Sequence, residues 1–133
     1  MKKLETEISI SPVRLSIVVV SISSHQSLIS CLDSILACEN QDKIEIIVAI
    51  NSFENSLPNL AIKYPCVRFI QFSQNMGIPD LSAEGITQAS GEIIALTDSS
   101  CLVDTGWITS ILEAHQSQSA VVGGRVEIHG LTK

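Results

Sequence analysis

Short apolar runs rich in β-branched residues alternate with helix-like segments along the chain, and this alternation most constrains the fold. We expect strands at residues 15–20, 44–50, 67–72, 92–97 and 119–128. We expect helices between them, at about residues 24–38, 58–64, 80–90 and 106–115. Pro79 suits the first turn of the third helix, and Gly91 is the expected C-cap at its end. Strands that alternate with helices favour a mostly parallel sheet with right-handed crossovers. The sequence therefore predicts an α/β fold in which about five mostly parallel strands carry helices on both faces.

The length of 133 residues predicts a single domain. Residues 1–13 mix charged with apolar residues and hold Pro12, so we expect an exposed lead-in there. Residues 14–133 then form the domain. The third strand, 67–72, alternates more clearly than the others and is expected nearer a sheet edge.

The composition excludes several classes of function. Hydrophobic residues make up 45% of the chain and charged residues 17%, which excludes disorder. The formal net charge is −6 and no Lys/Arg cluster is present, so we expect no nucleic-acid partner. The longest apolar stretch, residues 15–22, is too short to cross a bilayer, and no targeting signal precedes it. We therefore expect no transmembrane segment.

The four cysteines show no metal-binding spacing; they are Cys31, Cys38, Cys66 and Cys101. Cys31 falls on the apolar face of an expected helix, and Cys66 and Cys101 adjoin expected strands. Buried, reduced thiols are the favoured interpretation over disulfides. Reduced thiols predict a cytoplasmic protein.

One stretch, from Gly91 to Trp107, carries the strongest candidate for chemistry. Residues 93–96 are apolar and read as a strand that is covered on both faces. Residues 97–100 then place four side-chain oxygens at its carboxyl end, where α/β sheets bind ligands. Asp98 is the first candidate among them. An equally weighted alternative is that Asp98 and its serine neighbours only hydrogen-bond the turn backbone.

Five segments in order resemble the amino-terminal, nucleotide-binding half of family 2 glycosyltransferases with the GT-A fold. The resemblance covers about residues 14–128. The segments are LSIVVV with CLDSIL, EIIVAINS, YPCVRFIQFSQNMG, ASGEIIALTDSSCLVDTGWI and AVVGGRVEI. This resemblance implies a three-layer, Rossmann-like GT-A half that binds a nucleotide-diphosphate sugar.

The resemblance also implies a reaction and a set of site residues. The reaction is transfer of a sugar from the nucleotide donor to an acceptor hydroxyl, assisted by Mg²⁺ or Mn²⁺. Asp98 matches the first Asp of the metal-binding Asp-x-Asp motif, and Ser100 matches the second. Asn75 and Gly77 match the Asn-x-Gly turn that passes the nucleotide, and Gly77 can take a positive φ there. Together with Asn51, these residues form the expected nucleotide-sugar site, with Asp98 as metal ligand.

Departures from the family pattern weaken this expectation. Ser100 replaces a metal-binding carboxylate, which predicts a weakened metal site. Ile50 stands where the family has an acid that contacts the nucleobase, and the neighbouring Asn51 substitutes for it only partly. Ser82 and Ala83 stand where the family supplies an Arg and an Asn. The resemblance places the catalytic base and acceptor segment beyond Lys133, so this chain alone is expected to lack them.

The other ionisable residues offer no clear general base, which must lie within reach of the acceptor hydroxyl. Glu45 and Glu92 precede strands and are expected to be solvated. Asp104 is expected to cap the helix that follows it, and His25 and His115 are expected at helix ends without a catalytic role. The sequence therefore assigns no catalytic residue.

Two functional hypotheses remain. The first is a glycosyltransferase, or the donor-binding half of one. The alternative is a non-catalytic remnant of the fold that acts as a binding or assembly module. In either case the apolar strands that end near Ile128 predict an exposed sheet edge, to be covered by a second copy or a partner.

Overall fold

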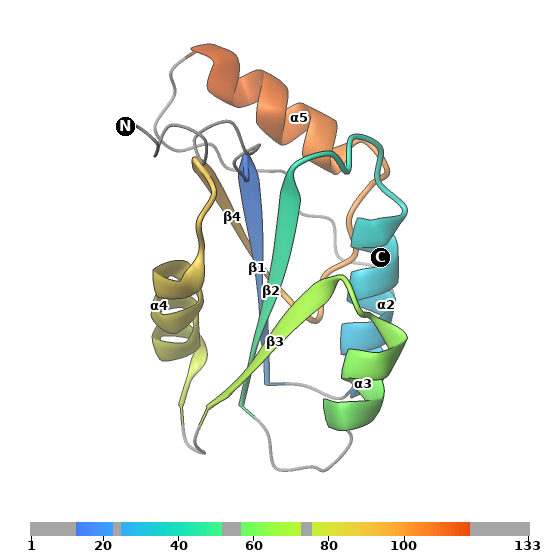
Figure 1. Cartoon of the computed structure of the whole chain (residues 1–133), viewed down its shortest axis with the longest axis vertical. Coiled ribbons are helices and arrows are strands. Elements are labelled where there is room, and N and C mark those ends of the chain that lie inside the picture. The colour runs from blue at the N-terminus through green and yellow to red at the C-terminus, as the bar shows by residue number, and fades with distance from the viewer. Residues whose placement is uncertain (1–12, 23–24, 52–56, 73–75, 118–133) are drawn as a thin grey trace, which may run out of the picture.

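The computed structural model describes residues 13–22, 25–51, 57–72 and 76–117, and four strands alternate with helices within them (Figure 1). The strands are β1 (Leu15–Ser21), β2 (Ile44–Asn51), β3 (Val67–Phe72) and β4 (Ile93–Asp98). The helices are α2 (His25–Leu36), α3 (Leu57–Lys63), α4 (Ile78–Gln88) and α5 (Trp107–Ala114), followed by the short 3₁₀ helix η1 (His115–Ser117). The order of strands and helices confirms the predicted α/β alternation.

The four strands form one parallel sheet in the order β3-β2-β1-β4. β1 and β2 lie in the middle and are buried along nearly their whole length. β3 lies at an edge, as its alternation predicts. The fifth expected strand, 119–128, lies outside the described residues. Because every strand is parallel, all four carboxyl ends meet at one edge of the sheet, at the bottom of Figure 1.

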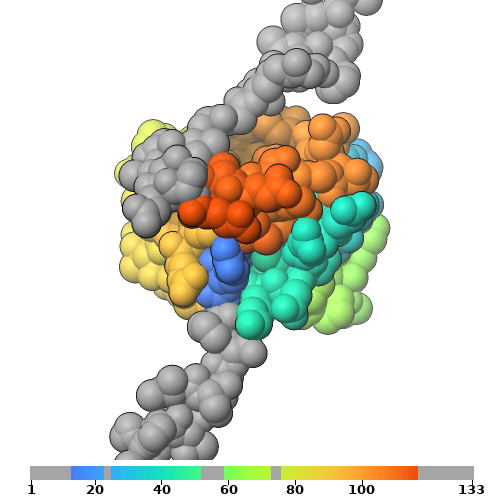
Figure 2. All heavy atoms as spheres, turned by 90° about the horizontal axis from the view of Figure 1, so that it is seen from above, coloured from blue at the N-terminus to red at the C-terminus, as the bar shows by residue number. Residues whose placement is uncertain are grey.

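Helices cover both faces of the sheet, as the three-layer prediction requires. On one face, Ile17 and Val19 of β1 pack with buried residues of α2 and with Ile108 of α5. On the other face, α4 lies over β1 and β2, and its Leu81 packs with Val20 and Ala49. Figure 2 looks onto the amino-terminal end of the sheet, where α5 (orange) lies beside the start of β1 (blue). The carboxyl edge lies at the opposite end of the molecule.

β4 corrects one prediction. Its apolar run was expected to be covered on both faces, but the exposed fractions of Ile94 and Leu96 are 40% and 49%. Both side chains lie on the α4 face, because their register partners Ser16 and Val18 belong to the α4 face of β1. α4 covers the central strands and leaves this face of β4 exposed. An apolar run therefore did not identify a fully covered strand.

The helix ends differ from expectation at two glycines. α4 begins with Pro79 in its first turn, as predicted, but its C-cap is Ala89 rather than Gly91. The N-cap of α5 is Gly106 rather than Asp104, whose backbone oxygen accepts a hydrogen bond from Trp107 N. All four cysteines are free thiols, but only Cys31 and Cys38 are buried as expected, whereas Cys101 is half-buried and Cys66 is exposed.

No helix among the described residues is long and apolar enough to span a membrane.

Candidate functional site at the carboxyl edge of the sheet

The sheet register brings Asn51 and Asp98 onto the same face of the carboxyl edge. Val20 of β1 pairs with Asp98 on one side and with Ala49 on the other, and register partners in a sheet point to the same face. Asn51 follows Ala49 by two residues and therefore shares this face. Two strand spacings separate the two strands, which is about 10 Å. This is the face on which α4 begins.

Asn51 presents a buried polar atom that lacks a partner. Its Nδ2 donates a 2.7 Å hydrogen bond to the backbone oxygen of Met76. Its Oδ1 is buried and has no hydrogen-bond partner among the described residues. A buried acceptor without a donor costs about 1–3 kcal/mol, so such atoms are rare in folded proteins. The Oδ1 of Asn51 is therefore a buried acceptor that is left without a donor.

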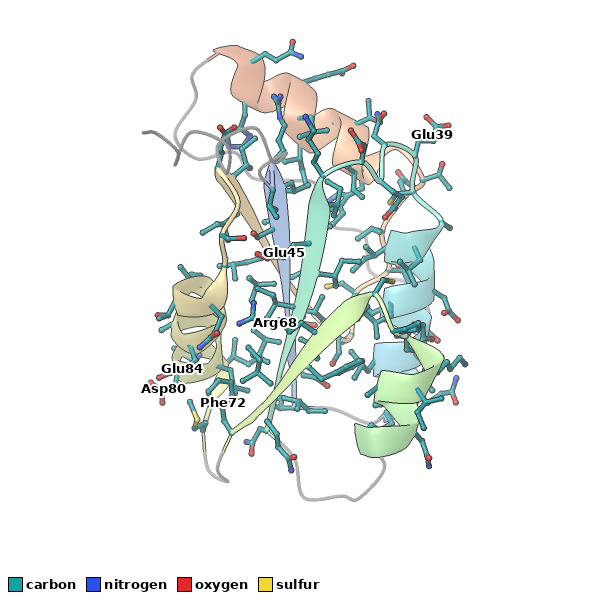
Figure 3. All side chains as sticks on the ribbon, in the orientation of Figure 1. Glu39, Glu45, Arg68, Phe72, Asp80 and Glu84 are labelled. Atoms are coloured by element: carbon teal, nitrogen blue, oxygen red, sulfur yellow. The ribbon has the colours of Figure 1, made fainter. Side chains whose placement is uncertain are left out.

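Two residues that the sequence did not single out adjoin Asn51. Phe72 is its register partner at the end of β3 and packs, together with Met76, against the cluster of Val20, Ala49 and Leu81. Figure 3 shows Phe72 at the carboxyl end of β3, on the side of α4. Only the register of β3 against β2 reveals this proximity, because the two residues lie in different segments of the chain.

Gly77 and the start of α4 lie next in the chain after Met76. Gly77 is the N-cap of α4, and no side chain caps this helix end. Its φ is −89°, so the left-handed conformation that glycine can take is not used here, and a Cβ would meet only Pro79 Cδ at 3.7 Å. Glycine is therefore not required at this position. Asn75, the other expected residue of this turn, lies outside the described residues.

Asp98 closes the turn that follows β4. Its Oδ1 accepts hydrogen bonds from the backbone N of Ser100 at 2.8 Å and from the Ser100 hydroxyl. The thiol of Cys101 lies 3.8 Å from the same oxygen. The turn is anchored to β1 by the hydrogen bond from Ser99 N to the backbone oxygen of Val20, at 2.9 Å. The Asp98 side chain therefore hydrogen-bonds the backbone of its own turn, as the second of the two sequence-based interpretations predicted.

These residues do not form a complete metal site by themselves. No group of three or more His, Cys, Asp or Glu side chains that could hold a metal ion occurs in the part of the chain that the structure describes. Figure 3 shows Asp80 and Glu84 on the outer side of α4, pointing away from the sheet, so neither joins Asp98. Mg²⁺ is commonly held by one or two carboxylates together with substrate phosphates. Asp98 fits a divalent ion only in that shared arrangement.

A thiol of α2 also contacts the Asp98 turn. Cys31 is fully buried, and its Sγ lies 3.7 Å from the backbone oxygen of Asp98. Burial, together with the neighbouring Cys101 and Asp98, raises the pKa of the Cys31 thiol to about 12. Cys31 is therefore a protonated thiol packed beneath the turn.

Glu45 was expected to be solvated, but it lies at the centre of a hydrogen-bonded cluster near the opposite edge. Its carboxylate accepts hydrogen bonds from Ser16 Oγ at 2.7 Å and from Ser90 N at 2.8 Å. Burial raises the pKa of Glu45, but these hydrogen bonds and the Arg68 guanidinium outweigh burial and hold that pKa below its usual value. Figure 3 shows Glu45 and Arg68 on the α4 side of the sheet. Ser16, a polar residue inside an apolar run, was the sequence signal for this cluster.

Comparison with known families supports the resemblance found in the sequence. The sequence model of Glycosyl transferase family 2 matches residues 16–132. A search of the curated proteins found no match.

Solved glycosyltransferase structures share the fold. S. aureus TarS (residues 1–349) superposes with a TM-score of 0.70 at 16% identity, covering 78% of this chain and 32% of TarS. The same protein in complex with UDP gives a TM-score of 0.69 at 17% identity, with the same coverage. The mannosyltransferase PcManGT from Pyrobaculum calidifontis, in complex with GDP-Man and Mn²⁺, gives 0.57 at 18% identity, covering 74% of this chain and 31% of its own. The chain thus spans about a third of the length of these proteins.

Proposed function

Because the chain belongs to glycosyl transferase family 2, we propose that it binds the nucleoside diphosphate of a sugar donor at the carboxyl edge of its sheet. Within this proposal the chain is the donor-binding part of an enzyme that transfers a sugar to an acceptor hydroxyl. The observation that carries the proposal is the buried, unpartnered Oδ1 of Asn51 on the same face as Asp98. TarS in complex with UDP or UDP-GlcNAc and PcManGT in complex with GDP-Man support the ligand class.

Asn51 reads the nucleobase in this proposal. One N–H of its Nδ2 is committed to Met76 O, so Asn51 offers the base one acceptor, Oδ1, and one remaining N–H beside it. Uracil presents a single N–H, at N3, whereas guanine presents two neighbouring donors that suit a carboxylate better. A site built to bond an N–H discriminates strongly against a ligand that lacks it. We therefore assign uridine as the preferred nucleoside, with Phe72 and Met76 as the apolar surface beside it.

Asp98 is the residue that would hold Mg²⁺ or Mn²⁺ at the diphosphate end of the donor. The ion, when bound, neutralises the charge that develops as the nucleoside diphosphate leaves. Ser100 orients the Asp98 carboxylate, since both its backbone N–H and its hydroxyl donate to Oδ1. By the resemblance, Asn75 and Gly77 belong to the turn that passes the nucleotide, and Gly77 is the N-cap of α4, which no side chain caps. Because the ion needs ligands from both Asp98 and the nucleotide phosphates, we expect this chain to bind the ion only together with the nucleotide.

Calorimetric titration tests this proposal. Wild-type protein should bind UDP more tightly with Mn²⁺ than without it. Asp98→Asn keeps an oxygen for the Ser100 hydrogen bonds, so it should fold normally but lose the Mn²⁺ enhancement. Failure of wild-type protein to bind UDP at millimolar concentration, with or without Mn²⁺, would refute the proposal.

A binding or assembly module without catalysis is the second candidate. The exposed side chains of Ile94 and Leu96 on β4 favour it, because adjacent apolar residues on one sheet face commonly mark an interaction surface. A second copy of the chain or another protein would then cover this face. The free thiols, two of them fully or largely buried, support the cytoplasm as the compartment for either candidate.

A further inference from the structure

We propose that Cys31 and Cys101 are a modification site, a thiol pair that closes to a disulfide across the Asp98 turn when the protein meets a low-molecular-weight disulfide. The two thiols belong to segments far apart in the sequence, α2 and the turn after β4. Both converge on Asp98. Nothing in the proposed donor site requires either thiol.

Asp98 contacts both cysteines. The backbone oxygen of Asp98 lies 3.7 Å from Cys31 Sγ and accepts a 3.1 Å hydrogen bond from Cys101 N. One atom therefore contacts both residues. Cys101 Sγ lies 3.8 Å from the Oδ1 of the same Asp98. Closing the disulfide requires the Cys101 side chain to rotate away from Oδ1 and toward Cys31.

The different exposure of the two thiols determines which of them reacts first. Cys101 is partly exposed and can meet a small disulfide such as oxidised glutathione, whereas Cys31 is fully buried and cannot. Cys101 therefore reacts first and Cys31 resolves the adduct. Cys38, the other buried thiol of this region, lies against Asp104 O at 3.2 Å and does not contact Asp98 in any described hydrogen bond.

Two exchange steps form the bond. In the first, the Cys101 sulfur, after losing its proton to solvent, attacks one sulfur of oxidised glutathione, and one glutathione leaves as the thiolate. In the second, the Cys31 sulfur attacks the Cys101 sulfur and its proton passes to the departing glutathione sulfur, so the second glutathione leaves as the thiol. The two protein thiols thus lose two electrons and two protons, and oxidised glutathione gains them as two thiols.

Peptide mapping of the full chain after incubation with oxidised glutathione tests the pair directly. Trypsin leaves Cys31 and Cys38 in the peptide 15–43, so a second cleavage beside Asp33 is needed to separate them. We expect a linked pair of peptides that contain Cys31 and Cys101 and weigh about 2 Da less than the two thiol peptides. Cys101 bonded to Cys38, or left as a glutathione adduct, would overturn the proposal.

Two variants sharpen the test. In Cys31→Ala, Cys101 should accumulate as the glutathione adduct, because the resolving thiol is gone. Cys66→Ser removes the exposed thiol outside this cluster and should leave the Cys31–Cys101 link unchanged. The peptide map of the wild-type protein remains a valid test of the disulfide even if Cys31→Ala fails to fold. None of these measurements uses a nucleotide, so their outcome is separate from that of the proposed donor site.

Discussion

The backbone N–H of Gly91 donates a 2.8 Å hydrogen bond to the hydroxyl of Ser16, at a point where the two chain segments nearly touch. A Cβ on Gly91 would lie 2.7 Å from Ser16 N and 3.0 Å from Leu15 C. Both are backbone atoms of the central strand, and they cannot move aside. This contact fixes the start of β4 against β1, and so sets the register that brings Asp98 beside Val20.

Gly91→Ala should therefore destabilise the protein. We expect the free energy of unfolding to fall by about 1–3 kcal/mol, the usual cost of overpacking a buried contact. Gly106→Ala is the matched control, because a Cβ there would meet nothing within 4 Å and should change stability little. Urea unfolding followed by circular dichroism measures both. Equal stability of the two variants would contradict the close contact.

Glu45 should make stability depend on pH. Its folded pKa is lowered, so its contribution is fully present above the unfolded value of 4.5 and is lost as pH falls through the folded pKa. Glu45→Gln should cost about 1–2 kcal/mol at pH 7 and should flatten the loss of stability below pH ~4.5. Unfolding curves at several pH values between about 3 and 7 would measure this change. Glu92→Gln, at an exposed position, should keep the wild-type slope.

Asn51→Leu should separate binding from stability. The variant loses the hydrogen bond to Met76 O but also removes the buried, unpartnered Oδ1, and these two effects offset each other. We expect thermal unfolding to change little while the dissociation constant for UDP rises at least about tenfold, or about 1.4 kcal/mol. Asn59→Leu, on the exposed face of α3, is the control and should bind UDP normally. Unchanged UDP affinity in Asn51→Leu would remove Asn51 from the site.

The exposed face of β4 should drive self-association. If Ile94 and Leu96 are covered by a second copy, sedimentation velocity should show a concentration-dependent dimer that the double change to Thr abolishes. Ile62→Thr is the control, because Ile62 is 79% exposed on α3 and lies off this face. A wild-type chain that stays monomeric at high micromolar concentration would argue against the assembly candidate.

Much of the fold followed from local patterns. The positions of all described strands were predictable within one or two residues, because β-branched runs and helical periodicity record which side chains are buried. The exposed face of β4 was not predictable, since it depends on which strands α4 covers. The helix ends at Ala89 and Gly106 also escaped prediction, because Gly91 serves a contact with β1 rather than a cap.

The candidate site was predictable in its residues but not in its contacts. Asp98 and Asn51 could be named from their places after apolar runs, but their shared face required the register of three strands. Glu45 was missed because its partners Ser16 and Ser90 lie 29 and 45 residues away in the sequence. Hydrogen bonds between distant segments leave only weak signals in one sequence, such as a serine inside an apolar strand.

The most direct test of the donor site compares UDP with UDP methylated at uracil N3, each titrated calorimetrically into the wild-type chain with Mn²⁺. The methyl group removes the one N–H that Asn51 Oδ1 is proposed to accept and leaves the diphosphate unchanged. The account predicts that UDP binds and that the methylated ligand binds at least about tenfold more weakly, a difference of about 1.4 kcal/mol. Equal affinity for the two ligands, or binding of neither, would contradict it.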